Sequence, residues 1–178
     1  MDIDAILMIE DEAEFIEDTA DELIKNNDPA WRRETDGLLC MLFDFTPSIE
    51  GYDDYDDRVM LHESDEAGVV SYSIGKSSDV LKADAPSFTT SVDLAIRLIP
   101  SGARWSLTED TAEIVWVDGD VVAKVTCLSI EDWHTPALVL VEAAMRCRAR
   151  QMLAEIRTES QTVDQSHPLA GANPAGNA

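Results

Sequence analysis

Basic residues are scarce in the first third of this 178-residue chain. The first 66 residues contain 22 Asp and Glu but only four Lys and Arg, a net charge of −18 out of −23 for the whole chain. Repulsion among like charges opposes a compact fold, so such a segment indicates either a need for solubility or a basic binding partner. The low isoelectric point, near 4.1, argues against direct binding to nucleic acid or to an anionic membrane.

Cysteines and long apolar runs are few as well. The three cysteines, Cys40, Cys127 and Cys147, form no Cys-x-x-Cys pair, which predicts free thiols in a reducing cytosol. No window approaches 18 uncharged apolar residues, so we expect no transmembrane helix. Residues 1–4 are acidic where the start of a signal peptide is basic, so we expect no secretion signal.

The common motifs of catalysis are missing too. The eight glycines form neither a phosphate-binding loop nor the Gly-x-Ser-x-Gly turn of hydrolases. His62, His134 and His167 are scattered, without the spacing of zinc ligands. Glu131 and Asp132 lie beside His134, so one interpretation is a catalytic base with its orienting carboxylate. We favour the other, in which residues 131–134 are a polar loop between a strand and a helix. The sequence therefore predicts no catalytic residue, no metal site and no cofactor.

Residues 9–24 have the apolar periodicity of an amphipathic helix. The apolar stripe consists of Ile9, Ala13, Ile16, Ala20, Leu23 and Ile24. Carboxylates repeat at helical spacing beside the stripe, and others add to the outer side; they include Glu10, Glu14, Glu17, Asp18 and Asp21. One interpretation is a solvated helix face. The other is a surface built to be negative, which we favour because the first basic residue is Lys25, at the helix end.

An acidic loop follows a second predicted helix. Asp28 and Pro29 have the pattern of an N-cap followed by a first-turn proline, and the helix is expected from Ala30 to about Phe45. Beyond it, four carboxylates flank one tyrosine in the run Asp53, Asp54, Tyr55, Asp56 and Asp57. A calcium-binding loop would need glycine at its sixth position, where this chain has Arg or Val. We therefore interpret the run as a solvated loop or as a patch that contacts a partner's Arg side chains.

Period-two patterns and turn signals predict an α+β fold. They place strands at residues 59–61, 69–74, 104–107, 112–117 and 121–127. A short helix is expected after Ser91, and a long one, buried in its first half, from Pro136 to about Ile156. The polar segment 76–86 is expected to be a connection. We predict an antiparallel sheet of four to six strands packed with helices. The chain is expected to divide into an acidic helical region (1–50), a sandwich domain (51–158) and a disordered tail (159–178).

Two parts of the C-terminal half resemble a known family. The first is residues 88–95 (FTTSVDLA), followed by 98–100 (LIP) and 104–106 (RWS); the second is residues 135–144 (TPALVLVEAA) with 148–150 (RAR). Their order and spacing resemble the phage ABA sandwich domain, and the resemblance covers about residues 86–151. It implies a phage or prophage origin and a helix-packed antiparallel sheet, and it implies no chemistry.

Three functions are compatible with these features. The one we favour is a phage-encoded, non-enzymatic inhibitor of a host defence system, such as an anti-CRISPR, acting in the host bacterial cytoplasm. Its acidic N-terminal region would be a DNA mimic that binds a basic, nucleic-acid-handling host protein. The second is a soluble phage accessory or structural protein whose acidity serves solubility only. The third is an enzyme of unrecognised type. The sequence predicts no oligomeric state.

Overall fold

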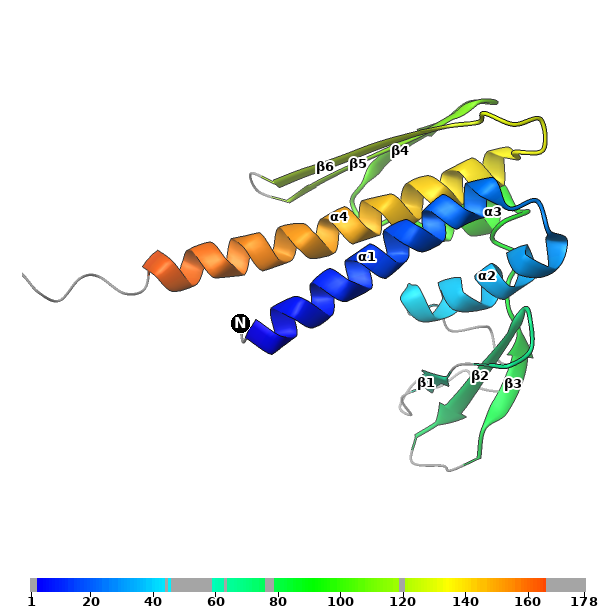
Figure 1. The fold of residues 1–178 in the computed structure, drawn as a ribbon, viewed down its shortest axis with the longest axis horizontal. Helices are drawn as coiled ribbons and strands as arrows, with labels where there is room; N and C mark the ends of the chain where they lie inside the picture. Colours follow the sequence, from blue (N-terminus) through cyan, green and yellow to red (C-terminus); the bar gives the residue numbers. More distant parts are fainter. Residues whose placement is uncertain are drawn as a thin grey trace, which may run out of the picture.

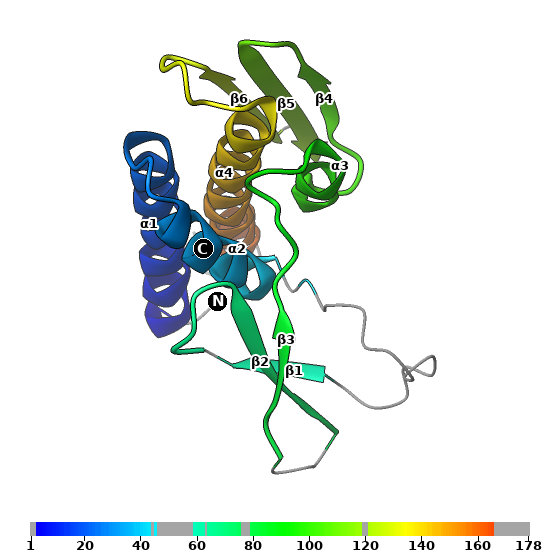
Figure 2. The ribbon, with the colours of Figure 1, turned by 90° about the vertical axis from the view of Figure 1, so that its right-hand side faces the viewer.

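Two long helices, α1 (Ile3–Lys25) and α4 (Pro136–Gln165), lie side by side and run in opposite directions (Figure 1, Figure 2). The computed structural model describes residues 3–43, 45, 59–62, 64–75, 79–118 and 121–165. Helix α1 confirms the amphipathic prediction but begins before residue 9. Residues 5–9 are apolar around the helix, so they lacked the period that identified the rest.

A three-stranded antiparallel sheet covers the other side of α4 (Figure 1). Its strands are β4 (Arg104–Leu107), β5 (Thr111–Asp118) and β6 (Val121–Leu128), in that order. Strands β5 and β6 pair over their full length, from Thr111 opposite Leu128 to Asp118 opposite Val121. The alternation of buried and exposed residues along both strands turns one face toward α4. This arrangement confirms the predicted hairpin.

A second antiparallel sheet lies on the far side of α2 (Pro29–Leu42) from α4 (Figure 2). It contains β1 (Val59–His62), β2 (Val69–Ile74) and β3 (Leu81–Asp84), with β2 in the centre. The α+β class is thus confirmed, but the strands form two sheets instead of one. Residues 85–103, which include α3 (Val92–Ala95), connect the two sheets across the core, so β3 and β4 never pair.

Strand β3 lies within the segment that was expected to be only a polar connection. It is an edge strand, held by main-chain pairing that places Leu81 opposite Tyr72 and Asp84 opposite Val69. Three of its four residues are exposed, and Ala83 is half-buried. A strand that buries so little has no clear apolar alternation, which is why its sequence did not reveal it.

Helix α2 is tied to this second sheet by the half-buried side chain of Arg33. Its Nη2 donates to the carbonyl of Gly68 and its Nη1 to the carbonyl of Ala85, both at 3.1 Å. Gly68 has a φ of +73°, and a Cβ there would lie 2.6 Å from Arg33 Nε. Glycine is therefore required both by the left-handed backbone and by the close approach of the guanidinium.

The buried carboxylate of Asp36 extends this link. It accepts a hydrogen bond from the backbone N–H of Thr89 at 2.9 Å and one from Arg33 at 3.3 Å. Burial raises the pKa of Asp36, although the hydrogen bonds from Thr89 and Arg33 oppose the rise. The pair joins α2 to the segment that enters α3.

Three predicted helix N-caps are confirmed. Asp28 Oδ1 accepts from the N–H of Ala30 at 2.9 Å, Ser91 Oγ from that of Leu94 at 3.4 Å, and Thr135 Oγ1 from that of Leu138 at 3.2 Å. Each satisfies one backbone donor that the first helical turn leaves unpaired. Local chemistry of this kind is readable from sequence alone.

The end of α4 differs from the prediction. The helix continues past Ile156 to Gln165, so the expected disordered tail does not begin at residue 159. Residues 159–165 are polar except Val163 and carried no apolar period, but they extend a helix that is already nucleated, which adds a hydrogen bond per residue without a new nucleus. Residues 166–178 lie outside the described part of the chain.

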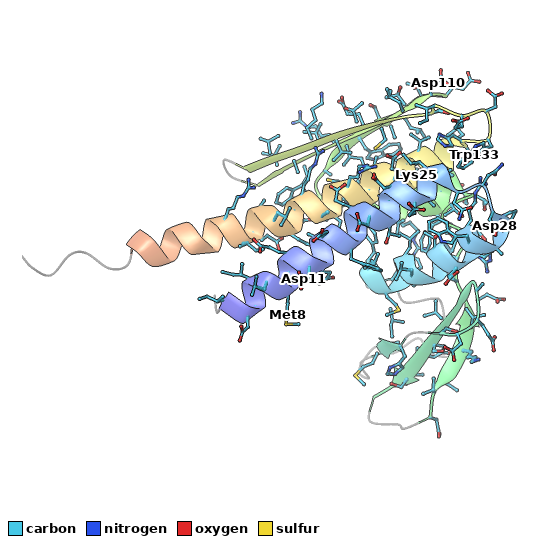
Figure 3. All side chains as sticks on the ribbon, in the orientation of Figure 1. Met8, Asp11, Lys25, Asp28, Asp110 and Trp133 are labelled. Atoms are coloured by element: carbon cyan, nitrogen blue, oxygen red, sulfur yellow. The ribbon has the colours of Figure 1, made fainter. Side chains whose placement is uncertain are left out.

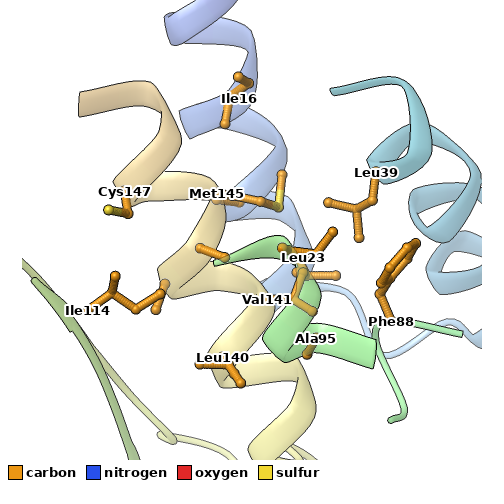
Figure 4. Packing of buried hydrophobic residues seen from close by; sticks show 14 of the residues in the cluster. Ile16, Leu23, Leu39, Phe88, Ala95, Ile114, Leu140, Val141, Met145 and Cys147 are labelled. Atoms are coloured by element: carbon orange, nitrogen blue, oxygen red, sulfur yellow. The ribbon is translucent and has the colours of Figure 1, made fainter. Parts of the chain in front are cut away.

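The core is centred on the first half of α4, which is buried around nearly its whole circumference as predicted. Its residues from Ala137 to Met145 are all less than 5 % exposed. Figure 4 shows Val141 and Met145 of α4 beside Leu23 of α1, with Ile114 of β5 on the opposite side of the helix. Helix α4 therefore connects α1 with the β4–β6 sheet through side-chain packing.

Leu23→Ala tests the packing of α1 on α4. Leu23 is 0 % exposed, so its truncation should lower the free energy of unfolding by about 2–5 kcal/mol through lost burial and the cavity left behind. Leu7→Ala on the same helix is the matched control. Because Leu7 is 51 % exposed, this substitution should lower the free energy of unfolding by well under about 1 kcal/mol. Urea denaturation followed by circular dichroism measures both. Equal effects of the two substitutions would contradict the packing of α1 on α4.

Candidate functional site

The outward side of α1 carries a run of exposed carboxylates. We define the α1 acidic face by four of them: Glu10, Asp11, Glu14 and Asp18. Glu14 lies three residues from Asp11 and four from both Glu10 and Asp18, spacings that place neighbouring side chains about 5–6 Å apart. Among the described residues, no Lys or Arg forms an ion pair with any of the four. Their charges therefore face solvent together.

Glu17 and Asp21, which were predicted to belong to the same free surface, are bound within the protein. Arg146 of α4 donates from Nη1 to Glu17 Oε2 at 2.7 Å and from Nη2 to Asp21 Oδ1 at 2.6 Å. The two carboxylates are one helical turn apart, so a single guanidinium spans both. The predicted row of four carboxylates is thus divided, with Glu10 and Glu14 free and Glu17 and Asp21 paired.

Arg146 is held from the α4 side as well. Its Nε donates to Glu142 Oε1 at 3.0 Å, and its side chain is only 19 % exposed. Burial opposes the charge of Arg146, but the hydrogen bonds that it donates to Asp21, Glu142 and Glu17 outweigh this effect and raise the pKa of the guanidinium. Arg146 lies in the interior of α4 (Pro136–Gln165) and connects α4 with α1.

Glu142 and Cys127 complete the inner side of this connection. Glu142 is 4 % exposed, and its second oxygen, Oε2, has no hydrogen-bond partner. Burial raises the pKa of Glu142, although Arg146 opposes the rise. Burial, together with the neighbouring Glu142 carboxylate, raises the pKa of the Cys127 thiol to about 12. A thiol so far from ionisation is no nucleophile, so this cluster is a structural ion network.

The other cysteines are equally unreactive by environment. All three are free and buried, as predicted. Burial raises the pKa of the Cys40 thiol to about 12, and it also raises that of Cys147. Each lies in the core cluster, where a thiol acts as a small apolar group.

His134 is part of the fold, as the favoured interpretation of residues 131–134 predicted. Its Nδ1 accepts from the N–H of Ile130 at 3.2 Å, and its Nε2 lies 2.9 Å from the carbonyl oxygen of Ile24. The ring is 7 % exposed and stands edge-on to Trp133, with centroids 4.3 Å apart. Figure 3 shows Trp133 at the end of the molecule where α1 ends and α4 begins. With both nitrogens engaged, His134 ties these two ends together.

The predicted acidic loop cannot be compared with the structure. Asp53, Asp54, Tyr55, Asp56 and Asp57 lie outside the described residues, so the predicted acidic loop has no geometry here. Within the residues described, no group of three or more His, Cys, Asp or Glu is arranged to hold a metal ion. In the same part of the chain, no helix is long and apolar enough to cross a bilayer.

Sequence reasoning missed the ion network between α1 and α4. One signal was present: Glu142 and Arg146 are four residues apart on a helix that is otherwise apolar in this part. Such a pair can form within the helix itself, and a charged residue in a buried helix face needs a partner. What could not be read was that Arg146 also reaches Glu17 and Asp21, because that depends on how two helices pack.

Removing Arg146 should be costly. Arg146→Met leaves Glu142 buried beside the Cys127 thiol without its cation, so the free energy of unfolding should fall by about 3 kcal/mol or more. The double variant Glu142→Gln with Arg146→Met removes the uncompensated charge and should be closer to the parent protein. Urea denaturation of both variants at neutral pH measures the difference. A double variant no more stable than Arg146→Met would contradict this account.

The pH dependence of Asp21 gives a second test. Hydrogen bonding to Arg146 holds the pKa of Asp21 below its usual value of 3.8. The stabilisation is therefore present above pH 3.8 and is lost as the pH falls through the lowered pKa. Because the side chain is about half exposed, screening should keep this contribution below about 1 kcal/mol. Asp21→Asn should be less stable than the parent from pH 5 to 7, and the difference should shrink toward pH 3 in urea titrations. A difference that grows on acidification would contradict the pairing.

Comparison with known proteins adds no relative to this geometry: no family model, no curated protein and no solved structure matches the chain.

Proposed function

We propose that this protein is a phage-encoded, non-enzymatic inhibitor of a host defence system that binds a basic, nucleic-acid-handling host protein. The contact surface is the α1 acidic face, and the anti-CRISPR proteins are one class of inhibitor of this kind. The observation that carries the proposal is the set of four exposed carboxylates without ion-pair partners, presented on a helix whose opposite side is buried.

The proposal is supported by the rigidity of this surface. Residues Ala13, Ile16 and Ala20 are at most 1 % exposed, and they anchor the inner side of α1 in the core. Carboxylates on an anchored helix need no ordering of the backbone on binding, which lowers the entropic cost of association. Negative charges about 5–6 Å apart along a helix edge can replace phosphates along one nucleic-acid strand in a basic groove. Direct binding of nucleic acid or membrane is not proposed.

A phage origin and action in the host bacterial cytoplasm are part of the same proposal. They rest on the resemblance of residues 86–151 to the phage ABA sandwich domain. The three buried free thiols are compatible with a reducing compartment.

A second candidate function has one specific observation in its favour. The face of the β4–β6 sheet that points away from α4 exposes Val117, Val122 and Leu128, which are 58, 62 and 56 % exposed. Val117 and Val122 are cross-strand partners at one end of the hairpin, and Leu128 lies at its other end; exposed apolar side chains on one face of a sheet can contribute to an assembly surface. A soluble phage accessory or structural protein would use this face, and its acidity would then serve solubility only.

Capture of partners from a bacterial lysate, identified by mass spectrometry, tests the first candidate. The test variant carries Glu10→Gln, Asp11→Asn, Glu14→Gln and Asp18→Asn, and it should lose the partner without losing stability, because like-charge repulsion is relieved. Glu17 and Asp21 are left unchanged because they hold Arg146. The matched control makes the same charge change at four exposed carboxylates elsewhere: Asp93, Glu109, Asp132 and Glu155.

Salt and nucleic acid provide the decisive readouts. Association should slow steeply as ionic strength rises from about 10 to 150 mM, where the Debye length falls from roughly 30 to 8 Å. Short duplex DNA should compete with the protein for the partner's basic groove. A partner whose affinity is insensitive to salt, to the test variant and to DNA would contradict the proposal. If capture is instead lost when Val117 and Val122 are replaced by Gln, the second candidate function replaces the first.

A further inference from the structure

A groove opens between α1, α2 and the β1–β2 hairpin, separate from the α1 acidic face. Its volume is about 310 Å³. Apolar side chains form its floor, namely Phe15, Leu38, Met41 and Val70. Carboxylates stand at its rim, namely Glu34, Asp65 and Glu66. A cavity of this size accepts one large side chain and the polar groups next to it.

Three of the four apolar lining residues are only partly covered by the core, whereas Val70 is buried. Phe15 is 49 % exposed, although it lies on the same helix as the buried Ile16, and Leu38 and Met41 are half-buried. The hairpin lies against α2 at Gly37, where a Cβ would be in van der Waals contact, 3.4 Å from the carbonyl oxygen of Val69. A ligand bound in a concave site removes such exposed apolar surface from water, which favours binding.

A further exposed apolar side chain lies on α1 outside the groove lining. Met8 lies two helical turns before Phe15 and is 72 % exposed, and Figure 3 shows it projecting from the side of α1 on which α2 lies. Methionine adapts to ligands of different shape because its side chain is unbranched and flexible.

The rim selects for positive charge. Glu34 and Asp65 are exposed, and neither forms an ion pair with a described Lys or Arg. Glu66 pairs with Lys82 at 2.6 Å, but both side chains are more than half exposed, so that pair is weak and exchangeable. Among the described residues, no Lys or Arg lines the groove. An apolar floor inside an acidic rim fits an apolar side chain that has cations beside it.

We propose that this groove binds a short segment of a partner protein that carries a large apolar side chain flanked by Lys or Arg. The inference rests on the proposed function, since it gives the basic partner a second point of attachment, next to the acidic face of the same helix.

Two other occupants fit less well. The chain's own residues 158–178 contain no Lys or Arg, so they cannot complement the rim. A second copy carries the same net charge of −23 and is repelled over the whole surface.

Fluorescence anisotropy with labelled hexapeptides tests the groove directly on the full chain. The probe is Arg-Arg-Leu-Leu-Arg-Arg, and the control Arg-Arg-Ser-Ser-Arg-Arg has the same charge without the apolar pair. The leucine peptide should bind roughly tenfold or more tightly than the serine peptide, since burial of one leucine alone can supply that factor. Equal affinities would mean that charge alone attracts the peptides, and this would overturn the proposal. So would the absence of leucine-peptide binding at about 1 mM, the affinity of a very weak contact.

Variants locate the binding. The double substitution Leu38→Gln and Met41→Gln should abolish the preference for the leucine peptide. Glu34→Gln, at an exposed site, should lower the affinity for both peptides. Val117→Gln with Val122→Gln, on the open face of the other sheet, is the matched control and should change neither affinity. If the leucine preference survives both groove variants, the groove is not the site.

The same variants separate this inference from the proposed function. If lysate capture is lost with the α1 acidic-face variant but unchanged in the groove variants, the groove inference is wrong and the proposed function stands. If the peptide binds as expected but no salt-sensitive partner is captured, the proposed function is wrong, and the groove remains a binding site for basic apolar segments.

Discussion

The seam between α1 and α4 is the interaction on which the rest of the molecule depends. Small and branched side chains of α1, from Ala13 to Leu23, are buried against the apolar first half of α4, and Arg146 binds Glu17 and Asp21 across the edge of the seam. Burial of apolar surface supplies most of the energy. The apolar stripe of α1 sets which side of the helix faces inward, and the ion network binds the carboxylates at its edge. With that rotation set, Glu10, Asp11, Glu14 and Asp18 are left facing solvent.

Helix α4 occupies the centre because it is apolar on nearly all sides over its first half. One side packs on α1 and another on the β4–β6 sheet, so two layers share one helix (Figure 1). The β1–β3 sheet is attached more locally, through Arg33 and Asp36 of α2. The groove lined by Phe15 of α1, by α2 and by the β1–β2 hairpin lies beside this attachment.

Both proposed contact surfaces are built on the same helix. The α1 acidic face offers charge to a basic partner, and the neighbouring groove offers apolar floor inside an acidic rim. Charge accelerates encounter and selects against acidic partners, whereas burial of an apolar anchor mainly slows dissociation. A partner using both would gain from each without any change in the shape of α1, since the inner side of the helix is already ordered.

Local chemistry let the sequence determine most of the elements and the class of fold. The N-caps at Asp28, Ser91 and Thr135, the helical stripe of α1 and the β5–β6 hairpin depend on residues close together in the chain, and all were predicted. Strand β3, the separation into two sheets and the extension of α4 were not. Tertiary structure alone decided which carboxylates of α1 are free. Glu14 and Glu17 are indistinguishable by type and spacing, and only the position of Arg146, more than a hundred residues away, pairs one and leaves the other in water. Sequence patterns encode periodicity along an element, whereas a salt bridge between elements depends on how their axes pack and rotate.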